Sequence, residues 1–96
     1  MKTFWVYIVL CSDASYYIGI TNDVERRVAE HNLGTDRHCY TFARRPVSLT
    51  YATEFPTPDE AIRFEKQIKG WSRKKKAALI AGDWNTIVSL SREARH

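Results

Sequence analysis

Cysteine is scarce in this sequence, since Cys11 and Cys39 are the only two in the chain. Two cysteines without a Cys-x-x-Cys spacing form neither a disulfide framework nor a zinc ribbon. A zinc site that joins them to His31 and His38 fits no known ligand spacing. Buried, reduced thiols are therefore expected, and they suit a cytoplasmic protein.

Long apolar runs are also missing. The longest begins the chain, from Phe4 to Cys11, and is too short to span a bilayer. Its Trp, Tyr and Val residues favour a β-strand over a secretion signal. There is no repeat and no low-complexity linker, so residues 1–96 are expected to form a single domain with a modest core. Neither a membrane nor a small-molecule cofactor is indicated as a partner.

Apolar periodicity and capping residues predict an α/β (α+β) chain in the order ββαβααα. Val47, Leu49, Tyr51 and Phe55 alternate with polar residues, which predicts that these four share the buried face of one strand. The segment 35–46 is predicted to be a polar, basic loop.

The predicted strands are 4–11, 16–20 and 47–55. The first helix is predicted from 24 to about 31, with an N-cap in Thr21-Asn22-Asp23 and an end at Asn32-Leu33-Gly34. Further helices are predicted at 58–70 after the Thr57–Glu60 capping box, at 73–82 between Ser72 and Gly82, and at 84–90 after Asp83.

The first predicted helix places two functional side chains beside its buried stripe. On a helical wheel Arg27 and His31 lie next to Val24 and Val28, at the edge of the apolar face. An arginine there can line a cleft and meet phosphate oxygens with its planar guanidinium. The same positions also fit an Arg27 that covers the edge of the core and a neutral, packed His31.

Glu65 is the carboxylate that most needs a partner. Its neighbours along the predicted helix 58–70 include Ala61, Ile62 and Ile68, so it leaves the helix beside the core. A carboxylate in that position is paired or bound to a cation. An ion pair with Arg27 and a site for a hard cation such as Mg²⁺ both remain open.

Several short motifs follow one another along the chain: Trp5-Val6-Tyr7, Tyr17-Ile18-Gly19, Arg26-Arg27 with His31-Asn32, the loop Cys39-Tyr40-Thr41 with Arg44-Arg45-Pro46-Val47, and Glu65. Taken in this order, they resemble the GIY-YIG nuclease superfamily, in its small stand-alone bacterial branch. The resemblance covers roughly residues 4 to 76.

The resemblance implies a three-stranded antiparallel sheet flanked by helices, and cleavage of nucleic acid with one divalent metal, Mg²⁺ or Mn²⁺. It also implies catalytic roles for five residues and a close approach of the backbone at Gly19. Only the tyrosine of the first triplet matches the family pattern, and the hairpin has Asp13-Ala14 where Asp-Gly would be ideal. The downstream polar residue of the family has Asn85 as its only candidate. The implied catalytic residues are Tyr7, Tyr17, Arg27, His31 and Glu65, with Glu65 as the metal ligand.

The expected chemistry is attack of water on a phosphodiester. Tyr7 could take the proton of that water only if neighbouring cations lower its pKa well below the ordinary value of about 10. Tyr17 or His31 would orient or share the proton, and the choice of base stays open. Tyr7 and Tyr17 face the same site only if their hairpin loop has an odd number of residues or a bulge shifts the register.

Positive charge gathers in two clusters in this chain of net charge +4, the first within residues 37–45 and the second within residues 66–76. No acid occurs from Lys66 to Gly82, and positive potential of this kind steers phosphates. The residues expected to bind nucleic acid are Arg37, Tyr40, Arg44 and Arg45, together with Lys66, Lys69, Arg73, Lys74, Lys75 and Lys76.

Three functions follow as hypotheses. The first is a metal-dependent endonuclease acting on DNA rather than RNA, either nonspecifically or on branched, nicked or single-stranded forms, as in DNA repair. The second is a non-catalytic nucleic-acid-binding module with the same fold. The third is a structural or protein-interaction domain in which Arg27 and Glu65 only pair.

Overall fold

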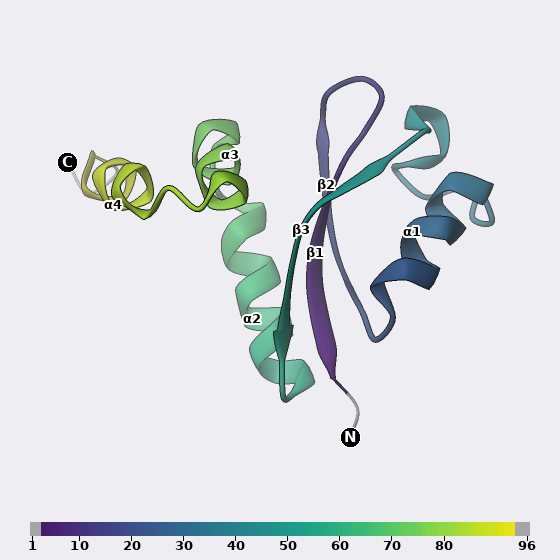
Figure 1. The fold of residues 1–96 in the computed structure, drawn as a ribbon, viewed down its shortest axis with the longest axis horizontal. Helices are drawn as coiled ribbons and strands as arrows, with labels where there is room; N and C mark the ends of the chain where they lie inside the picture. The colour runs from purple at the N-terminus through teal and green to yellow at the C-terminus, as the bar shows by residue number, and fades with distance from the viewer. Residues whose placement is uncertain (1–2, 94–96) are drawn as a thin grey trace. The chain divides into compact units, whose positions relative to one another are not determined.

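The computed structural model describes residues 3–93 of the chain (Figure 1). Its contacts divide the chain into two compact units, Met1–Lys66 and Gln67–His96. The first unit contains the whole β-sheet and helix α1 (Val24–Leu33). Helix α2 (Pro58–Lys69) begins in the first unit and ends in the second.

The sheet has three antiparallel strands in the spatial order β2-β1-β3. Strand β1 (Phe4–Leu10) is central, between β2 (Tyr16–Thr21) and β3 (Ser48–Phe55). Its middle residues, from Val6 to Val9, are at most 1% exposed. The central position of β1 explains why this strand is apolar on both faces. The three-stranded antiparallel sheet with its helices confirms the predicted fold class.

The hairpin of β1 and β2 brings the two tyrosines to one face of the sheet. Five residues, 11–15, connect the strands, and no bulge interrupts their pairing. Tyr7 pairs with Gly19, and Tyr17 pairs with Val9. Because paired residues share a face and alternate residues along a strand do too, Tyr7 and Tyr17 project together. An odd number of residues in this loop was the condition expected from the sequence, and it is met because β1 ends at Leu10, one residue before the predicted end.

Ala14 at the tip of this hairpin has φ +68°. An L-residue in that region is strained by roughly 1–2 kcal/mol, whereas glycine is not. We expect Ala14→Gly to raise the free energy of unfolding by about 0.5–1 kcal/mol, after the entropy of the more flexible unfolded chain is subtracted. Urea unfolding measures the change. The matched control Ala29→Gly, on the exposed face of α1, should instead destabilise by about 1 kcal/mol, and equal effects would refute the turn argument.

Helix α1 begins and ends as the sequence predicts. The Asp23 side chain caps it by accepting from the backbone N–H of Arg26, and Gly34 closes it with φ +71°. Beyond it, the Asn32 side chain accepts from the backbone N–H of Val47 at 2.7 Å and donates to its carbonyl at 3.0 Å. These two bonds fasten the helix to the start of β3.

Two local predictions were wrong. The segment 35–46 is not loop throughout, because Phe42–Arg44 forms a short 3₁₀ helix. The predicted buried face of the third strand is also broken, because a bulge shifts the β1–β3 register between Ile8 and Val9. Leu49 therefore pairs with Val9 and lies on the opposite face of the sheet from Tyr51 and Phe55, where it is 46% exposed. The hydroxyl of Thr50, the extra residue, donates to the Ile8 carbonyl at 3.0 Å.

Helix α2 begins at the predicted Thr57–Glu60 capping box, and its Phe64 ring lies against Phe55 of β3. The C-terminal unit holds α3 (Arg73–Ala81), capped by Ser72, and α4 (Trp84–Glu93). The order ββαβααα is thus confirmed. None of the helices within residues 3–93 has the length and apolarity needed to cross a membrane.

Candidate active site

Three rings meet on the face of the sheet that the tyrosines share. The His31 ring of α1 lies 5.2 Å from the Tyr17 ring and 5.9 Å from the Tyr7 ring, between centroids. The two tyrosine rings are 6.4 Å apart. The fold therefore assembles side chains from β1, β2 and α1 that are far apart in the sequence.

His31 is buried and neutral. Only 4% of its surface is exposed. Burial lowers the pKa of its imidazole below the ordinary 6.5, and the positive charge of Arg27 lowers it further, against a smaller opposite effect of Glu30. Its Nε2 lies 2.7 Å from Oη of Tyr7. A neutral imidazole can accept a proton there.

Tyr7 is protonated in the protein alone. Burial, and then the neighbouring Tyr17, raise the pKa of Tyr7 to about 12, although a hydrogen bond and the charge of Arg27 act in the opposite direction. The pKa well below 10 that the sequence analysis required of a tyrosine base is therefore not reached. The phenol can give its proton to His31, since Arg27 can only donate to it.

Gly19 leaves room for the Tyr7 hydroxyl. A Cβ atom at position 19 would stand 2.6 Å from Oη of Tyr7 and 2.8 Å from Cζ of the same ring. A side chain there would displace the phenol from His31, in agreement with the crowding expected at this position.

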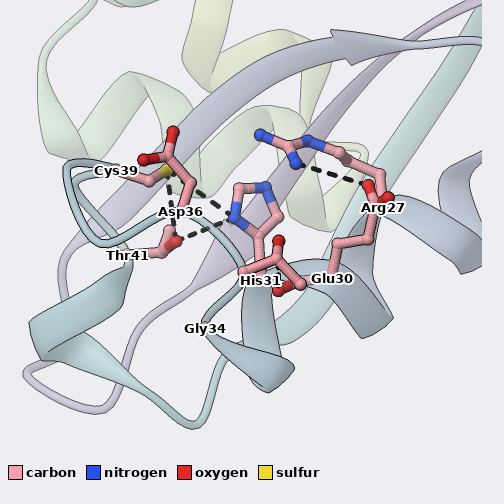
Figure 2. Close-up of a pocket in the computed structure, with 8 residues that line it drawn as sticks. Arg27, Glu30, His31, Gly34, Asp36, Cys39 and Thr41 are labelled. Carbon is pink, nitrogen blue, oxygen red and sulfur yellow. Dashed lines mark hydrogen bonds and ion pairs between the residues drawn. The ribbon is translucent and has the colours of Figure 1, made fainter.

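Arg27 lies at a hollow beside His31. The hollow is also lined by Glu30, Asp36, Cys39 and Thr41, and Figure 2 shows the Arg27 guanidinium above the imidazole. Arg27 makes an ion pair with Glu30 of its own helix, Nη1 to Oε1, at 3.4 Å. Partly exposed pairs of this kind contribute about 0–1 kcal/mol, so the pair with Glu30 would do little to keep the guanidinium from a bound phosphate.

Glu65 stands apart from these four residues in the chain, on α2, where it is half-buried. Its charge acts on the site through Tyr17. Burial and Cys39 are the larger reasons that the pKa of Tyr17 is raised, and the carboxylate of Glu65 adds a smaller contribution. Within residues 3–93 no three acidic, histidine or cysteine side chains are grouped as a metal cage.

Sequence reasoning missed two members of the site, Thr41 and Cys39. Thr41 is 1% exposed, and its Oγ1 lies 2.7 Å from Nδ1 of His31. The same oxygen lies 3.4 Å from Sγ of Cys39 (Figure 2). Cys39 also has a hydrogen bond with Tyr17. Both residues come from an irregular segment without periodicity. Their place in the Cys39-Tyr40-Thr41 motif was the sequence signal that could have identified them.

The residues expected to bind nucleic acid lie in different surroundings. Tyr40 stacks on Tyr17 with ring centroids 6.2 Å apart, and the Arg44 guanidinium lies 3.7 Å from the Tyr40 centroid. Arg44 also pairs with Asp13 at 3.0 Å, and Arg45 donates to the Phe42 carbonyl. These contacts of Tyr40, Arg44 and Arg45 stabilise the loop itself. Arg37 is exposed. Of the second cluster, Lys66 belongs to the first unit and Lys69, Arg73, Lys74, Lys75 and Lys76 belong to the C-terminal unit.

The comparisons with known proteins identify the family of the chain. The family model described as the GIY-YIG catalytic domain matches residues 3–78. A UPF0213 protein of Halobacterium salinarum is 51% identical over 75 residues, which cover 78% of this chain and 96% of the relative. A UPF0213 protein of Staphylococcus saprophyticus is 44% identical over 81 residues, 84% of this chain and 98% of the relative.

Solved structures extend the match to the fold. A UPF0213 protein from Bacillus halodurans, solved by solution NMR, aligns with a TM-score of 0.54 and 40% identity over 82% of this chain and 83% of its own. A protein from E. faecalis, also solved by NMR, aligns with a TM-score of 0.60 and 36% identity over 85% and 86%. The chain therefore belongs to the GIY-YIG nuclease superfamily, through its GIY-YIG catalytic domain.

Proposed function

We propose that this protein is a metal-dependent endonuclease that hydrolyses phosphodiester bonds of DNA rather than RNA, nonspecifically or on branched, nicked or single-stranded forms. One observation carries the proposal. Tyr7, Tyr17 and His31 meet on one face of the sheet, with Arg27 beside His31. Because the chain belongs to the GIY-YIG family, we interpret this cluster as a site for cleavage of phosphodiesters.

The donor set fits Mg²⁺ or Mn²⁺ better than a caged metal. Mg²⁺ is commonly held by one or two carboxylates, with waters and substrate phosphate as its other ligands. Glu65 is half-buried, carries a negative charge that reaches Tyr17, and needs no further protein ligand for such a site. A divalent cation held by Glu65 would supply a Lewis acid for the leaving 3′ oxygen.

Tyr7 and His31 can move the proton together. Tyr7 takes a proton from the attacking water while its own phenolic proton passes to Nε2 of His31, 2.7 Å away. The phenol stays neutral through this step, so its raised pKa is no obstacle. His31 becomes the imidazolium ion. The neutral state of His31 in the resting protein is what this transfer requires.

Arg27 would contact the phosphoryl group. Its guanidinium is half-buried at the hollow beside His31. A fixed positive charge at the oxygens where negative charge develops is often the largest contribution to catalysis. Its planar form suits two phosphate oxygens at once.

The charge needed to hold a polyanion is concentrated in the C-terminal unit. Residues 1–66 contain eight Lys and Arg against nine Asp and Glu, whereas residues 67–96 contain seven against two. The first unit is thus close to neutral, and the excess positive charge of the chain lies beyond it. Arg73, Lys74, Lys75 and Lys76 begin α3, which we propose as the main contact to the phosphate backbone. No element resembles a base-reading motif, so cleavage without sequence preference is expected.

The test is nicking of plasmid and branched DNA by the purified protein with Mg²⁺, with Mn²⁺ and with EDTA. Cleavage is expected only with metal. Arg27→Ala should lower the rate about 10²–10³-fold, because it removes a charge from the developing phosphoryl oxygens. Arg26→Ala is the matched control, since Arg26 is an exposed arginine of the same helix whose guanidinium donates to Oδ1 of Asn22 at 3.0 Å.

Two outcomes would contradict the proposal. Equal cleavage by the wild type, by Arg27→Ala and in EDTA would mean a contaminating nuclease. Salt-sensitive binding of DNA without any metal-dependent cleavage would favour the non-catalytic binding module instead.

A further inference from the structure

Thr41 is a buried hydroxyl that the proposed chemistry does not use. It stands just before the 3₁₀ helix and is 1% exposed. Its Oγ1 is 2.7 Å from Nδ1 of His31 and 3.4 Å from Sγ of Cys39 (Figure 2). A buried hydroxyl with two partners is oriented, and its orientation constrains the ring beside it.

The donor and the acceptor of each hydrogen bond around His31 can be assigned in turn, from Arg27 through Tyr7, His31 and Thr41 to Cys39. Oη of Tyr7 receives a bond from Arg27, which can only donate, so the phenolic hydrogen is free to go to Nε2 of His31 at 2.7 Å. A neutral imidazole that accepts at Nε2 carries its hydrogen on Nδ1. Thr41 accepts that hydrogen and gives its own to Sγ of Cys39. The hydroxyl of Tyr7, the Nδ1–H of His31 and the hydroxyl of Thr41 then each meet an acceptor.

We propose that Thr41 is a positioning residue that holds His31 in the Nδ1–H tautomer, and so keeps Nε2 open to the proton of Tyr7. This inference rests on the proposed function, because it concerns the same proton transfer. Thr41 acts through His31, since the hydrogen bonds of its Oγ1 go to His31 and Cys39. Cys39 completes the arrangement by accepting the hydrogen of Thr41.

The opposite tautomer shows why the hydroxyl matters. With hydrogen on Nε2, His31 and Tyr7 would point two donors at each other, and one of them would lose its bond. Valine at position 41 has nearly the shape of threonine but cannot accept from Nδ1, and the other neighbour of Nδ1, Sγ of Cys39 at 3.8 Å, is only a weak acceptor. It would therefore favour that opposite tautomer. Serine keeps the acceptor and is expected to restore the wild-type arrangement.

The test reads the tautomer directly in the full-length, ¹⁵N-labelled protein at neutral pH. Long-range proton–nitrogen correlation spectra report which ring nitrogen of His31 carries the hydrogen, and His31→Gln identifies its signals. We expect Nδ1–H in the wild type and in Thr41→Ser, and a shift towards Nε2–H in Thr41→Val. Thr50→Val is the matched control, because Thr50 donates its hydroxyl to the Ile8 carbonyl and lies away from His31 in the bulge of β3.

Kinetics supply the second reading. Thr41→Val is expected to lower kcat for DNA cleavage about ten- to a hundredfold with KM little changed, as is typical when a residue behind a functional histidine is lost. Thr41→Ser should stay within a few-fold of the wild type.

The outcomes separate the two proposals. A wild-type His31 with hydrogen on Nε2, or an unchanged tautomer in Thr41→Val, overturns the role of Thr41 whether or not DNA is cleaved. A tautomer that depends on Thr41 in a protein that cleaves no DNA supports the positioning role and overturns the proposed nuclease function.

Discussion

Glu65→Gln is expected to lower the rate of metal-dependent DNA cleavage by about 10³-fold or more, because several kcal/mol of stabilisation of the leaving oxygen depend on the cation. Glutamine has nearly the same size but no charge, and hard divalent cations bind it far more weakly. The loss should lie in the chemical step and in metal affinity. Binding of DNA should be unchanged or slightly tighter, since one negative charge is removed.

Two measurements check this result. Single-turnover cleavage gives the rate, and binding of Mn²⁺ in the absence of DNA gives the metal affinity. Asp59→Asn is the matched control, because it removes one exposed carboxylate from the first turn of the same helix, α2. Retention of full metal-dependent cleavage by Glu65→Gln would remove Glu65 from the proposed site. Equal losses in both variants would point to a general effect of charge.

The elements that local chemistry determines could be predicted from the sequence. Asp23 and Gly34 mark the ends of α1, and Ser72 and Gly82 mark those of α3, because caps act within one helical turn. Elements that depend on distant partners could not. The bulge that puts Leu49 on the opposite face of the sheet from Tyr51 arises from pairing between β3 and β1. The 3₁₀ helix ends at Arg44, which is tied to Asp13 of the hairpin.

The same distinction applies to the site. From the sequence, only the condition under which Tyr7 and Tyr17 share a face could be predicted, because the parity of the hairpin loop depends on β1 ending at Leu10 rather than at the predicted Cys11. Arg27 and His31 could be placed together because both lie on the side of α1 that carries Val24 and Val28. The protonation of Tyr7 could not be predicted, since its pKa depends on burial by the whole fold. The role of Thr41 required coordinates, because an irregular loop carries no periodicity that would aim a side chain at Nδ1 of His31.

Tyr7→Phe is expected to lower the cleavage rate by about 10²–10⁴-fold, the usual range for loss of a group that transfers a proton in the transition state. Phenylalanine fills the same space, so the core should persist. Nε2 of His31 loses its donor. Tyr16→Phe is the matched control, because Tyr16 alternates with Tyr17 along β2 and so projects to the other face of the sheet. Comparable losses in both variants would contradict a specific role for Tyr7.

Alkaline stability tests the same hydroxyl without any DNA. The pKa of Tyr7 is raised from 10.0 in the unfolded chain to about 12 in the folded protein. A group with a raised folded pKa contributes stability that is fully present below pH 10 and is lost as the pH rises through about 12. The difference corresponds to roughly 3 kcal/mol. Urea unfolding from pH 8 to pH 12 should therefore show a steeper loss of stability in the wild type than in Tyr7→Phe.

Tyr17 also has a raised pKa, so some alkaline destabilisation is expected to remain in Tyr7→Phe. On the acid side, the lowered pKa of His31 means that cleavage should persist through pH 6.5 and decline only below it, as the imidazole gains the proton that it must otherwise receive from Tyr7. Parallel stability curves for the wild type and Tyr7→Phe, together with cleavage that already declines above pH 6.5, would mean that Tyr7 and His31 do not share a proton. The wild type should lose stability more steeply at high pH, and its cleavage rate should decline only below pH 6.5. Both results are expected from one buried hydrogen bond, the 2.7 Å contact between Oη of Tyr7 and Nε2 of His31.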